Sequence, residues 1–327
     1  MKICVLTGLL TLFIIVFCMG CPVEEIIESP FIKGLTLDNY PKVDGSTSTA
    51  PLNAIIASKL LGIDYTWEDK SGIMSLRPNL NKKNLEIFNN RIKSSQTHQS
   101  FINLIDKKAD LILSARKMSP DEKAYANTAG ITLTETPIAL DAFIFIVNPD
   151  NPIQSLTIKQ IQDIYTGKIT SWKEVGVNDA DWGFLWDNTE IKPYIRNANS
   201  GSQELMEMMV MKGLEAAELP ENYRELIFNM TGALDAVSKQ QNSICYTVYY
   251  YKEHIARRGG RTVKSIAIDE ILPTRETISD GSYPLTAEVY AVIRSDLNKS
   301  SMAYKVYEWI QTETGKRAIV ESGYIQN

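Results

Sequence analysis

Histidine and cysteine are scarce in this chain of 327 residues, which limits the chemistry it can carry out. It has only two histidines, His98 and His254, and of its four cysteines only Cys245 lies beyond residue 21. Beyond that residue the sequence contains no Gly-x-Ser-x-Gly, His-Glu-x-x-His or Cys-x-x-Cys motif. Catalytic triads, zinc sites and disulfide frameworks therefore lack their usual sequence signatures. We expect a protein that is not an enzyme and that holds no metal and no cofactor.

The chain also lacks any long run of basic residues. Its 34 Lys and Arg are outnumbered by 39 Asp and Glu, so the net charge is −5. Nucleic acid and acidic polymers are therefore poor partner candidates. An acidic protein can still bind a small anion when its cationic groups are local, which directs the search to a pocket. The composition, 44% hydrophobic and 22% charged, is globular and allows one large domain or two lobes.

Long apolar segments are absent except at the N-terminus. Lys2 precedes an apolar run over residues 3–20 that only Thr7 and Thr11 interrupt. This pattern predicts a signal peptide over residues 1–20. An uncleaved anchor stays open as an alternative, because about 18 apolar residues could just span a bilayer. An ordinary secretory signal is the third possibility, and all three place the body outside the cytoplasm.

The end of this segment, Gly20-Cys21, resembles the lipobox of bacterial lipoproteins. The resemblance implies that Cys21 carries lipid chains such as palmitate and becomes the mature N-terminus. The protein would then be anchored to a bacterial membrane, at the cell surface or in the periplasm. Cys18 departs from the pattern, because leucine is usual at that position. Residues 21–39 would form a tether.

From residue 40 onward, short apolar runs alternate with helical patterns, which predicts an α/β fold of mostly parallel sheet covered by helices. Strands are expected at residues 40–43, 110–114, 194–196, 244–251 and 288–293. Helices are expected after Pro51, around residues 101–105, after Thr157, over residues 205–213 and over residues 304–310. The run Ala139 to Val147 is the most apolar and is expected to be a central strand.

Two loops rich in Ser, Thr and Gly are candidate anion sites, because each joins a predicted strand to a predicted helix. They are Asp44-Gly45-Ser46-Thr47-Ser48-Thr49 and Asn199-Ser200-Gly201-Ser202. The first turn of a helix offers unpaired N–H groups and partial positive charge, and small hydroxyl residues add donors without bulk. Either loop alone could be an ordinary helix cap.

Arg196, four residues before Ser200, strengthens the second loop as an anion site. A guanidinium adds a full charge and a planar fork of donors suited to a phosphoryl-type oxyanion. A surface ion pair is the alternative for this residue.

These loops resemble those of the phosphate-binding proteins that serve ABC transporters. Residues 44–52 are similar to the first phosphate loop of that family, and residues 108–114 to its second strand and loop. Residues 196–202 are similar to its Arg-x-x-x-Ser-Gly-Thr signature. Further matches at residues 164–172 and at Ile244-Cys245-Tyr246 follow in family order, so the resemblance covers about residues 43–327.

The resemblance implies a two-lobed periplasmic-binding-protein fold of type II, with two crossover strands. Lobe 1 would comprise residues 40–137 and 285–327, and lobe 2 residues 138–284. The residues implied to face the ligand are Ser46, Thr47, Ser48, Thr49, Thr97, Ser114, Arg196, Ser200, Gly201 and Ser202. His98, near Thr97, is expected to be a loop histidine rather than a ligand group.

The implied function is capture of phosphate or a similar oxyanion by a monomer, followed by delivery to an ABC permease in the membrane. An oxyanion sensor or surface adhesin with the same fold is the alternative, and a phosphoester hydrolase is a more remote one.

Two positions depart from the family pattern. Ala115 stands where the best-known members carry an aspartate that accepts a hydrogen bond from protonated phosphate and repels a fully ionised anion. Ala198 stands where a second carboxylate orients the arginine. We therefore expect sulfate or another oxyanion to compete better than in an aspartate-bearing relative. Arg116, beside Ala115, could add positive charge or could be a solvated surface residue.

Overall fold

The computed structural model describes residues 27–70, 73–178, 189–214, 225–227, 230–256 and 262–327. The predicted signal peptide and Cys21 lie outside these residues. Within the described part, no helix combines the length and the apolar character needed to cross a membrane.

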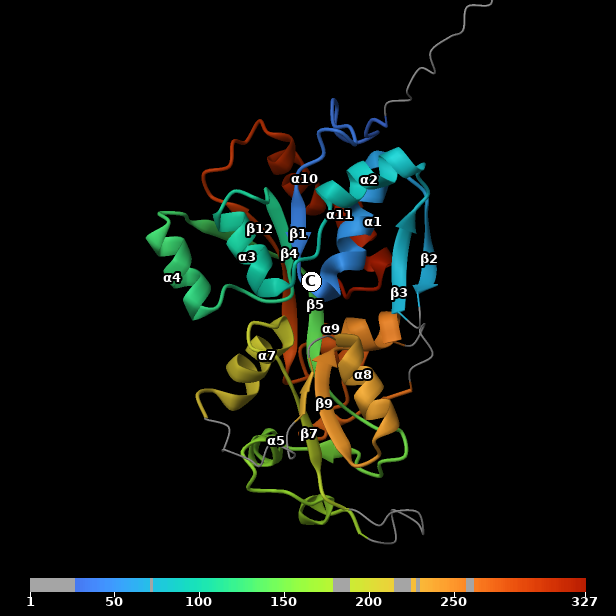
Figure 1. Ribbon diagram of the computed structural model, residues 1–327, viewed down its shortest axis with the longest axis vertical. Helices are drawn as coiled ribbons and strands as arrows, with labels where there is room; N and C mark the ends of the chain where they lie inside the picture. The colour runs from blue at the N-terminus through green and yellow to red at the C-terminus, as the bar shows by residue number, and fades with distance from the viewer. Residues whose placement is uncertain (1–26, 71–72, 179–188, 215–224, 228–229, 257–261) are drawn as a thin grey trace, which may run out of the picture.

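The fold is built on a mixed sheet that runs along the long axis of the molecule (Figure 1). Its strand order is β1 (Val43–Gly45), β4 (Leu111–Ser114), β12 (Thr286–Arg294), β5 (Leu133–Val147), β9 (Ser243–Val248), β7 (Lys192–Arg196) and β8 (Glu225–Ile227). β10 (Lys264–Ser265) pairs with β5, and β6 (Ser155–Leu156) pairs with β11 (Ala267–Ile268) in a separate small sheet.

One long strand, β5, joins the two ends of the molecule. β5 is 15 residues long; its first part pairs with β12, and its last residues, Phe143–Val147, pair with β9. The predicted parallel pairing holds for β1 with β4 and for β7 with β8 and β9. β5 and β12, by contrast, are antiparallel to their neighbours in the main sheet, and of the two only β5 also pairs with β9 of the lower half. The run Ala139 to Val147 is central, as its apolar composition predicts.

We call the elements at the top of Figure 1 the upper half. Beside β1 and β4 it contains the 3₁₀ turn η1 (Thr47–Thr49), α1 (Ala50–Leu61), the hairpin β2 (Tyr65–Lys70) and β3 (Ile73–Pro78), α2 (Lys82–Arg91), α3 (Thr97–Ile105), α4 (Pro120–Thr128), α10 (Met302–Ile310) and α11 (Glu313–Ser322). The helix expected after Pro51 is α1, which ends at Gly62 in a left-handed conformation.

The lower half surrounds β7 and β9. It contains α5 (Ile158–Tyr165), the 3₁₀ turn η2 (Trp172–Val175), α7 (Gly201–Leu205), the π-helical turn η4 (Met206–Met211), α8 (Met230–Lys239) and the π-helical turn η5 (Tyr251–Ala256). A short helix, α9 (Arg275–Ser279), contacts β5. Thr157 caps α5 through a capping box, as expected. The helix expected over residues 205–213 continues as η4 instead of as a regular α-helix.

The two halves share one main hydrophobic core. Buried residues of the upper half, such as Leu52 and Val306, belong to the same cluster as Trp172 and Leu234 of the lower half. β5 links them, because Ala142 to Val147 are all fully buried. The bounds of the two predicted lobes remain a prediction, although the elements assigned to each gather at opposite ends of Figure 1.

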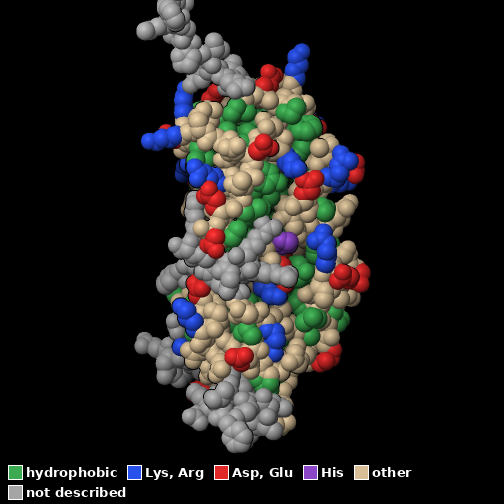
Figure 2. Space-filling model, turned by 90° about the vertical axis from the view of Figure 1, so that its right-hand side faces the viewer, with side chains coloured by type: hydrophobic (Ala, Val, Ile, Leu, Met, Phe, Trp, Pro, Cys, Tyr) green, Lys and Arg blue, Asp and Glu red, His purple; other side chains and the backbone are tan. Residues whose placement is uncertain are grey.

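On the face that carries the β2–β3 hairpin, the described residues form no continuous patch of one charge. Figure 2 shows Lys and Arg side chains interspersed with Asp and Glu over both halves of this face.

Candidate functional site

A pocket of about 200 Å³ lies where the two halves meet. The upper half lines it with Ser46, Thr47, Ser48, Ser94, Gln96, Thr97 and Ala115. The lower half lines it with Arg196, Ser200, Gly201, Ser202, Leu205, Met230 and Val248. The elements next to these lining residues, the start of α1, α3 and α7, lie near the middle of Figure 1.

Most of the predicted ligand residues come together in this pocket. Those that line it are Ser46, Thr47, Ser48, Thr97, Arg196, Ser200, Gly201 and Ser202. Thr49 and Ser114 do not line it. The Thr49 hydroxyl donates to the backbone carbonyls of Ser46 and Leu113, at 3.0 and 2.8 Å. The Ser114 hydroxyl donates to the carbonyl of Arg116 at 2.6 Å, so both side chains brace the loops beside the pocket.

Ser46 joins the upper loops to one another. Its hydroxyl accepts a hydrogen bond from the backbone N–H of Ala115 at 3.0 Å and lies 2.9 Å from the hydroxyl of Thr97. Gly45, just before it, has to be glycine, because a Cβ atom there would overlap the carbonyl oxygen of Leu113. Close packing of backbone on backbone therefore sets the position of Ser46.

Asp44 is buried and holds the same loops from behind. Its Oδ1 atom accepts from the backbone N–H groups of Gly45 and Ser95, each at 2.8 Å, and its Oδ2 atom accepts from Asn103 at 2.7 Å. Its carboxylate is thus occupied by structural hydrogen bonds.

Arg196 is the only charged side chain among the described residues that line the pocket. It is 6% exposed, and its Nε atom donates to the carbonyl of Ile227 at 3.0 Å. Burial lowers the pKa of Arg196, and the nearby Cys245, Tyr246 and Tyr251 only partly oppose this. An arginine stays charged in proteins, so its desolvated guanidinium favours a bound anion. Arg196 is therefore a buried pocket residue, and the alternative of a surface ion pair is wrong.

The second loop is ordered by its own side chains. Ser200 caps α7, because its hydroxyl accepts from the backbone N–H of Gln203 at 3.1 Å. The Gln203 amide oxygen accepts from the hydroxyl of Tyr246, and this hydroxyl also accepts from the backbone N–H of Arg196 at 2.9 Å. Tyr246 therefore fixes the start of the loop relative to β7.

Gly201 and Thr97 bring the two halves into contact at the pocket. A Cβ atom on Gly201 would overlap the Oγ1 atom of Thr97 and would lie 3.3 Å from its Cβ atom. The halves thus pack closely on either side of the pocket, an arrangement that a larger residue at position 201 would prevent.

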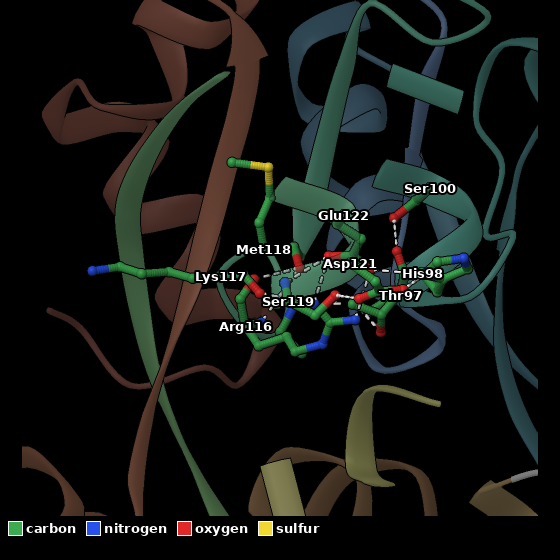
Figure 3. A network of polar contacts seen from close by, with 12 residues as sticks. Thr97, His98, Ser100, Arg116, Lys117, Met118, Ser119, Asp121 and Glu122 are labelled. Atoms are coloured by element: carbon green, nitrogen blue, oxygen red, sulfur yellow. Dashed lines mark hydrogen bonds and ion pairs between the residues drawn. The ribbon is translucent and has the colours of Figure 1, made fainter. Parts of the chain in front are cut away.

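A buried ion pair fixes the turn after β4 (Figure 3). Arg116 and Glu122 make two hydrogen bonds of 2.8 Å, and both side chains are almost completely buried. Glu122 also accepts from the backbone N–H of Ser119 at 2.9 Å and lies 3.1 Å from His98 Nδ1. Arg116 is therefore neither solvated nor an unpaired charge. His98 does not line the pocket, but it is not the loop histidine that the sequence predicted, because it lies in α3.

Sequence reasoning missed five pocket residues: Ser94, Gln96, Leu205, Met230 and Val248. Gln96 directly precedes α3 with a φ of 72°, a conformation unusual for a side chain of its size, but this feature is visible only in the structure. The last three are apolar and gave no polar signal. Among the described residues, no group of His, Cys, Asp and Glu is arranged to hold a metal ion.

Comparison with known proteins gives a consistent family assignment. The PBP superfamily domain matches residues 80–314. The phosphate-binding protein PstS of Staphylococcus saprophyticus is 26% identical over 235 residues, which are 71% of this chain and 69% of that protein. The phosphate-binding protein PstS of Pseudomonas aeruginosa is 23% identical over 309 residues, 88% of this chain and 86% of that one.

Solved structures of similar proteins support the fold. A substrate-binding protein from Clostridium perfringens, solved with bound phosphate, superposes with a TM-score of 0.62 at 23% identity, over 88% of this chain and 100% of that chain. An ABC-type phosphate transport receptor from Vibrio cholerae gives a TM-score of 0.60 at 22% identity, over 87% and 99% of the two chains. At these identities the similarity establishes the architecture.

Proposed function

The chain belongs to the PBP superfamily, and from that premise we propose that it captures phosphate or a similar oxyanion between its two halves and delivers it to an ABC permease. The observation that carries the proposal is the burial of Arg196 in a pocket whose other polar lining is formed by hydroxyl groups and an amide. The names of its relatives, phosphate-binding proteins and a phosphate transport receptor, support the same ligand class.

Each half supplies part of the site. Ser46 and Thr97 come from the upper half, and Arg196 with Ser200 from the lower half. A ligand that touches both halves stabilises the arrangement in which they are together, so binding is coupled to closure. A permease that recognises the closed shape would then accept only loaded protein.

The proposal also covers the location of the protein, its membrane anchor and its oligomeric state. Cys21 carries the lipid anchor, and a monomer works outside the cytoplasm at a bacterial membrane. Substitution Cys21→Ser should abolish incorporation of labelled palmitate and release the protein from the membrane fraction. The protein binds its ligand without transforming it, so incubation with phosphoesters should release no phosphate.

The decisive experiment is calorimetric titration of ligand-stripped protein with phosphate, sulfate, molybdate and small carboxylates. We expect oxyanions to bind and carboxylates to bind weakly. Arg196→Ala should remove most of the affinity, because a buried anion would lose its countercharge. Unchanged affinity in that variant would show that the anion binds elsewhere.

A further inference from the structure

The pocket has an apolar wall that an inorganic oxyanion does not need. Leu205, Met230 and Val248 are the last residue of α7, the first of α8 and the last of β9, and all three are 6% exposed or less. Ala115 adds a fourth apolar side chain from the upper half. The ends of separate elements thus converge on one pocket with side chains that offer no hydrogen-bond donor.

Such a wall disfavours an anionic oxygen. An anionic oxygen loses its hydrogen bonds to water when it enters the pocket, and only donors of the protein can replace them. These four side chains offer no donor. A carbon substituent has the opposite preference, since leaving water for an apolar surface is favourable. A tetrahedral ligand with some oxygens and one apolar group would match both kinds of lining.

The charges of the lining fit the same ligand. Among the described residues that line the pocket, Arg196 is the only cation and there is no carboxylate. A monosubstituted phosphoryl compound carries a charge similar to that of inorganic phosphate at pH 7, so the single guanidinium serves either ligand. No carboxylate is present to accept the proton of a protonated phosphate.

The size of the pocket allows a substituent. Its volume of about 200 Å³ equals the liquid volume of roughly six or seven water molecules, at about 30 Å³ each. That is enough for a phosphoryl group together with a small alkyl group.

We propose that the preferred ligand is a monosubstituted phosphoryl compound, an alkylphosphonate or an alkyl phosphate, with its oxygens on Arg196 and the hydroxyl loops and its alkyl group against Leu205, Met230 and Val248. This inference rests on the proposed function and specifies its ligand. One methyl group in an apolar pocket changes affinity by roughly ten-fold or more, so the preference is measurable.

The test is calorimetric titration of the ligand-stripped full chain at pH 7 with inorganic phosphate, methylphosphonate and methyl phosphate. At least one substituted ligand should bind ten-fold or more tightly than inorganic phosphate, and the stronger of the two identifies a carbon–phosphorus or an ester linkage. A smaller advantage, or tighter binding of inorganic phosphate, overturns the inference and leaves the proposed function intact. If no oxyanion binds, the proposed function fails as well.

Variants of the wall give a second, independent readout. Val248→Thr keeps the shape and adds a hydroxyl, so the affinity ratio of substituted ligand to phosphate should fall at least three-fold. Val237→Thr is the matched control, because Val237 is fully buried in α8 but does not line the pocket. An unchanged ratio in a folded Val248→Thr protein would overturn the assignment of the wall.

Discussion

Gly201 and Ala115 are the two small side chains at the pocket that we expect to control its closure and its selectivity. The packing of Gly201 on Thr97 leaves no room for a Cβ atom, and position 115 decides whether the lining carries a carboxylate. The close packing at Gly201 depends on the missing Cβ atom, and the uncharged lining at Ala115 depends on the missing carboxylate.

Gly201→Ala should weaken oxyanion binding about ten-fold or more, which corresponds to about 1.4 kcal/mol. The added methyl group would overlap the Thr97 hydroxyl and hold the halves apart. Titration calorimetry measures the loss. The double variant Thr97→Ala/Gly201→Ala removes the overlapping oxygen and should bind better than Gly201→Ala alone. A single variant with native affinity would show that this contact does not limit closure.

Ala115→Asp should change the selectivity between anions. In the native protein we expect sulfate to compete with phosphate, because the described lining has no carboxylate to repel it. An added carboxylate would repel fully ionised sulfate, whereas protonated phosphate could donate a hydrogen bond to it. The affinity ratio of phosphate to sulfate should rise at least ten-fold in competition titrations at pH 7. Ala115→Asn, which has the same size without the charge, should leave the ratio closer to native.

Between elements, the buried pair of Arg116 and Glu122 holds α3 and α4 to the turn after β4. Glu122 is fully buried, and it connects Arg116, the start of α4 and His98. Because Thr97 immediately precedes His98 and Ala115 immediately precedes Arg116, the pair also positions two pocket residues.

Glu122→Gln should lower the free energy of unfolding by about 3–5 kcal/mol, since it leaves a buried guanidinium without its counter-ion. Denaturant unfolding measures the difference. Glu313→Gln is the contrasting control. The Glu313 side chain is 80% exposed and pairs with Lys316, and such exposed pairs contribute at most about 1 kcal/mol to stability. A loss as small in Glu122→Gln as in the control would contradict the assigned role of the pair.

The sequence predicted the elements that carry their own local signals. Pro51 marked the start of α1, Thr157 capped α5, and the apolar run ending at Val147 marked the central strand. The hairpin β2–β3 was missed, because its strands mix polar and apolar residues without a regular period.

For the site, polar loops were predictable and their long-range partners were not. The hydroxyl loops and Arg196 stand out as sequence patterns and reach the same pocket. The apolar wall did not stand out, because Met230 and Val248 look like ordinary core residues until the ends of α8 and β9 are brought together. Nor could Arg116 be paired with Glu122 in advance, since several carboxylates lie within reach along the chain.

Across the whole molecule, β5 is the main link between the halves, and an acidic side chain lies in it. Asp141 is 3% exposed, and its Oδ1 atom accepts from the backbone N–H groups of Ala142 and Tyr250. Its Oδ2 atom is buried without a hydrogen-bond partner among the described residues. Burial raises the pKa of Asp141 to about 7, and the two hydrogen bonds only partly oppose this.

Stability should therefore fall as pH rises from about 4 to about 7, and level off above that. In this window native Asp141 keeps its proton while the unfolded chain has released it, so rising pH favours the unfolded state. At about 1.4 kcal/mol per pH unit, the contribution is on the order of 4 kcal/mol. Asp141→Asn cannot ionise, and thermal unfolding between pH 4 and 8 should show a flatter profile for it. Parallel profiles for the two proteins would rule out this residue as the cause.

The continuity of β5 and of the core has a calorimetric consequence. Two domains joined by a loop can melt separately, each with its own heat-absorption peak. Here one strand is hydrogen-bonded to β12 above and to β9 below, and one hydrophobic cluster spans both halves. Neither half keeps its core if the other melts, so heating should give a single cooperative transition. Ligand bound at the junction would then raise the melting temperature of the entire chain.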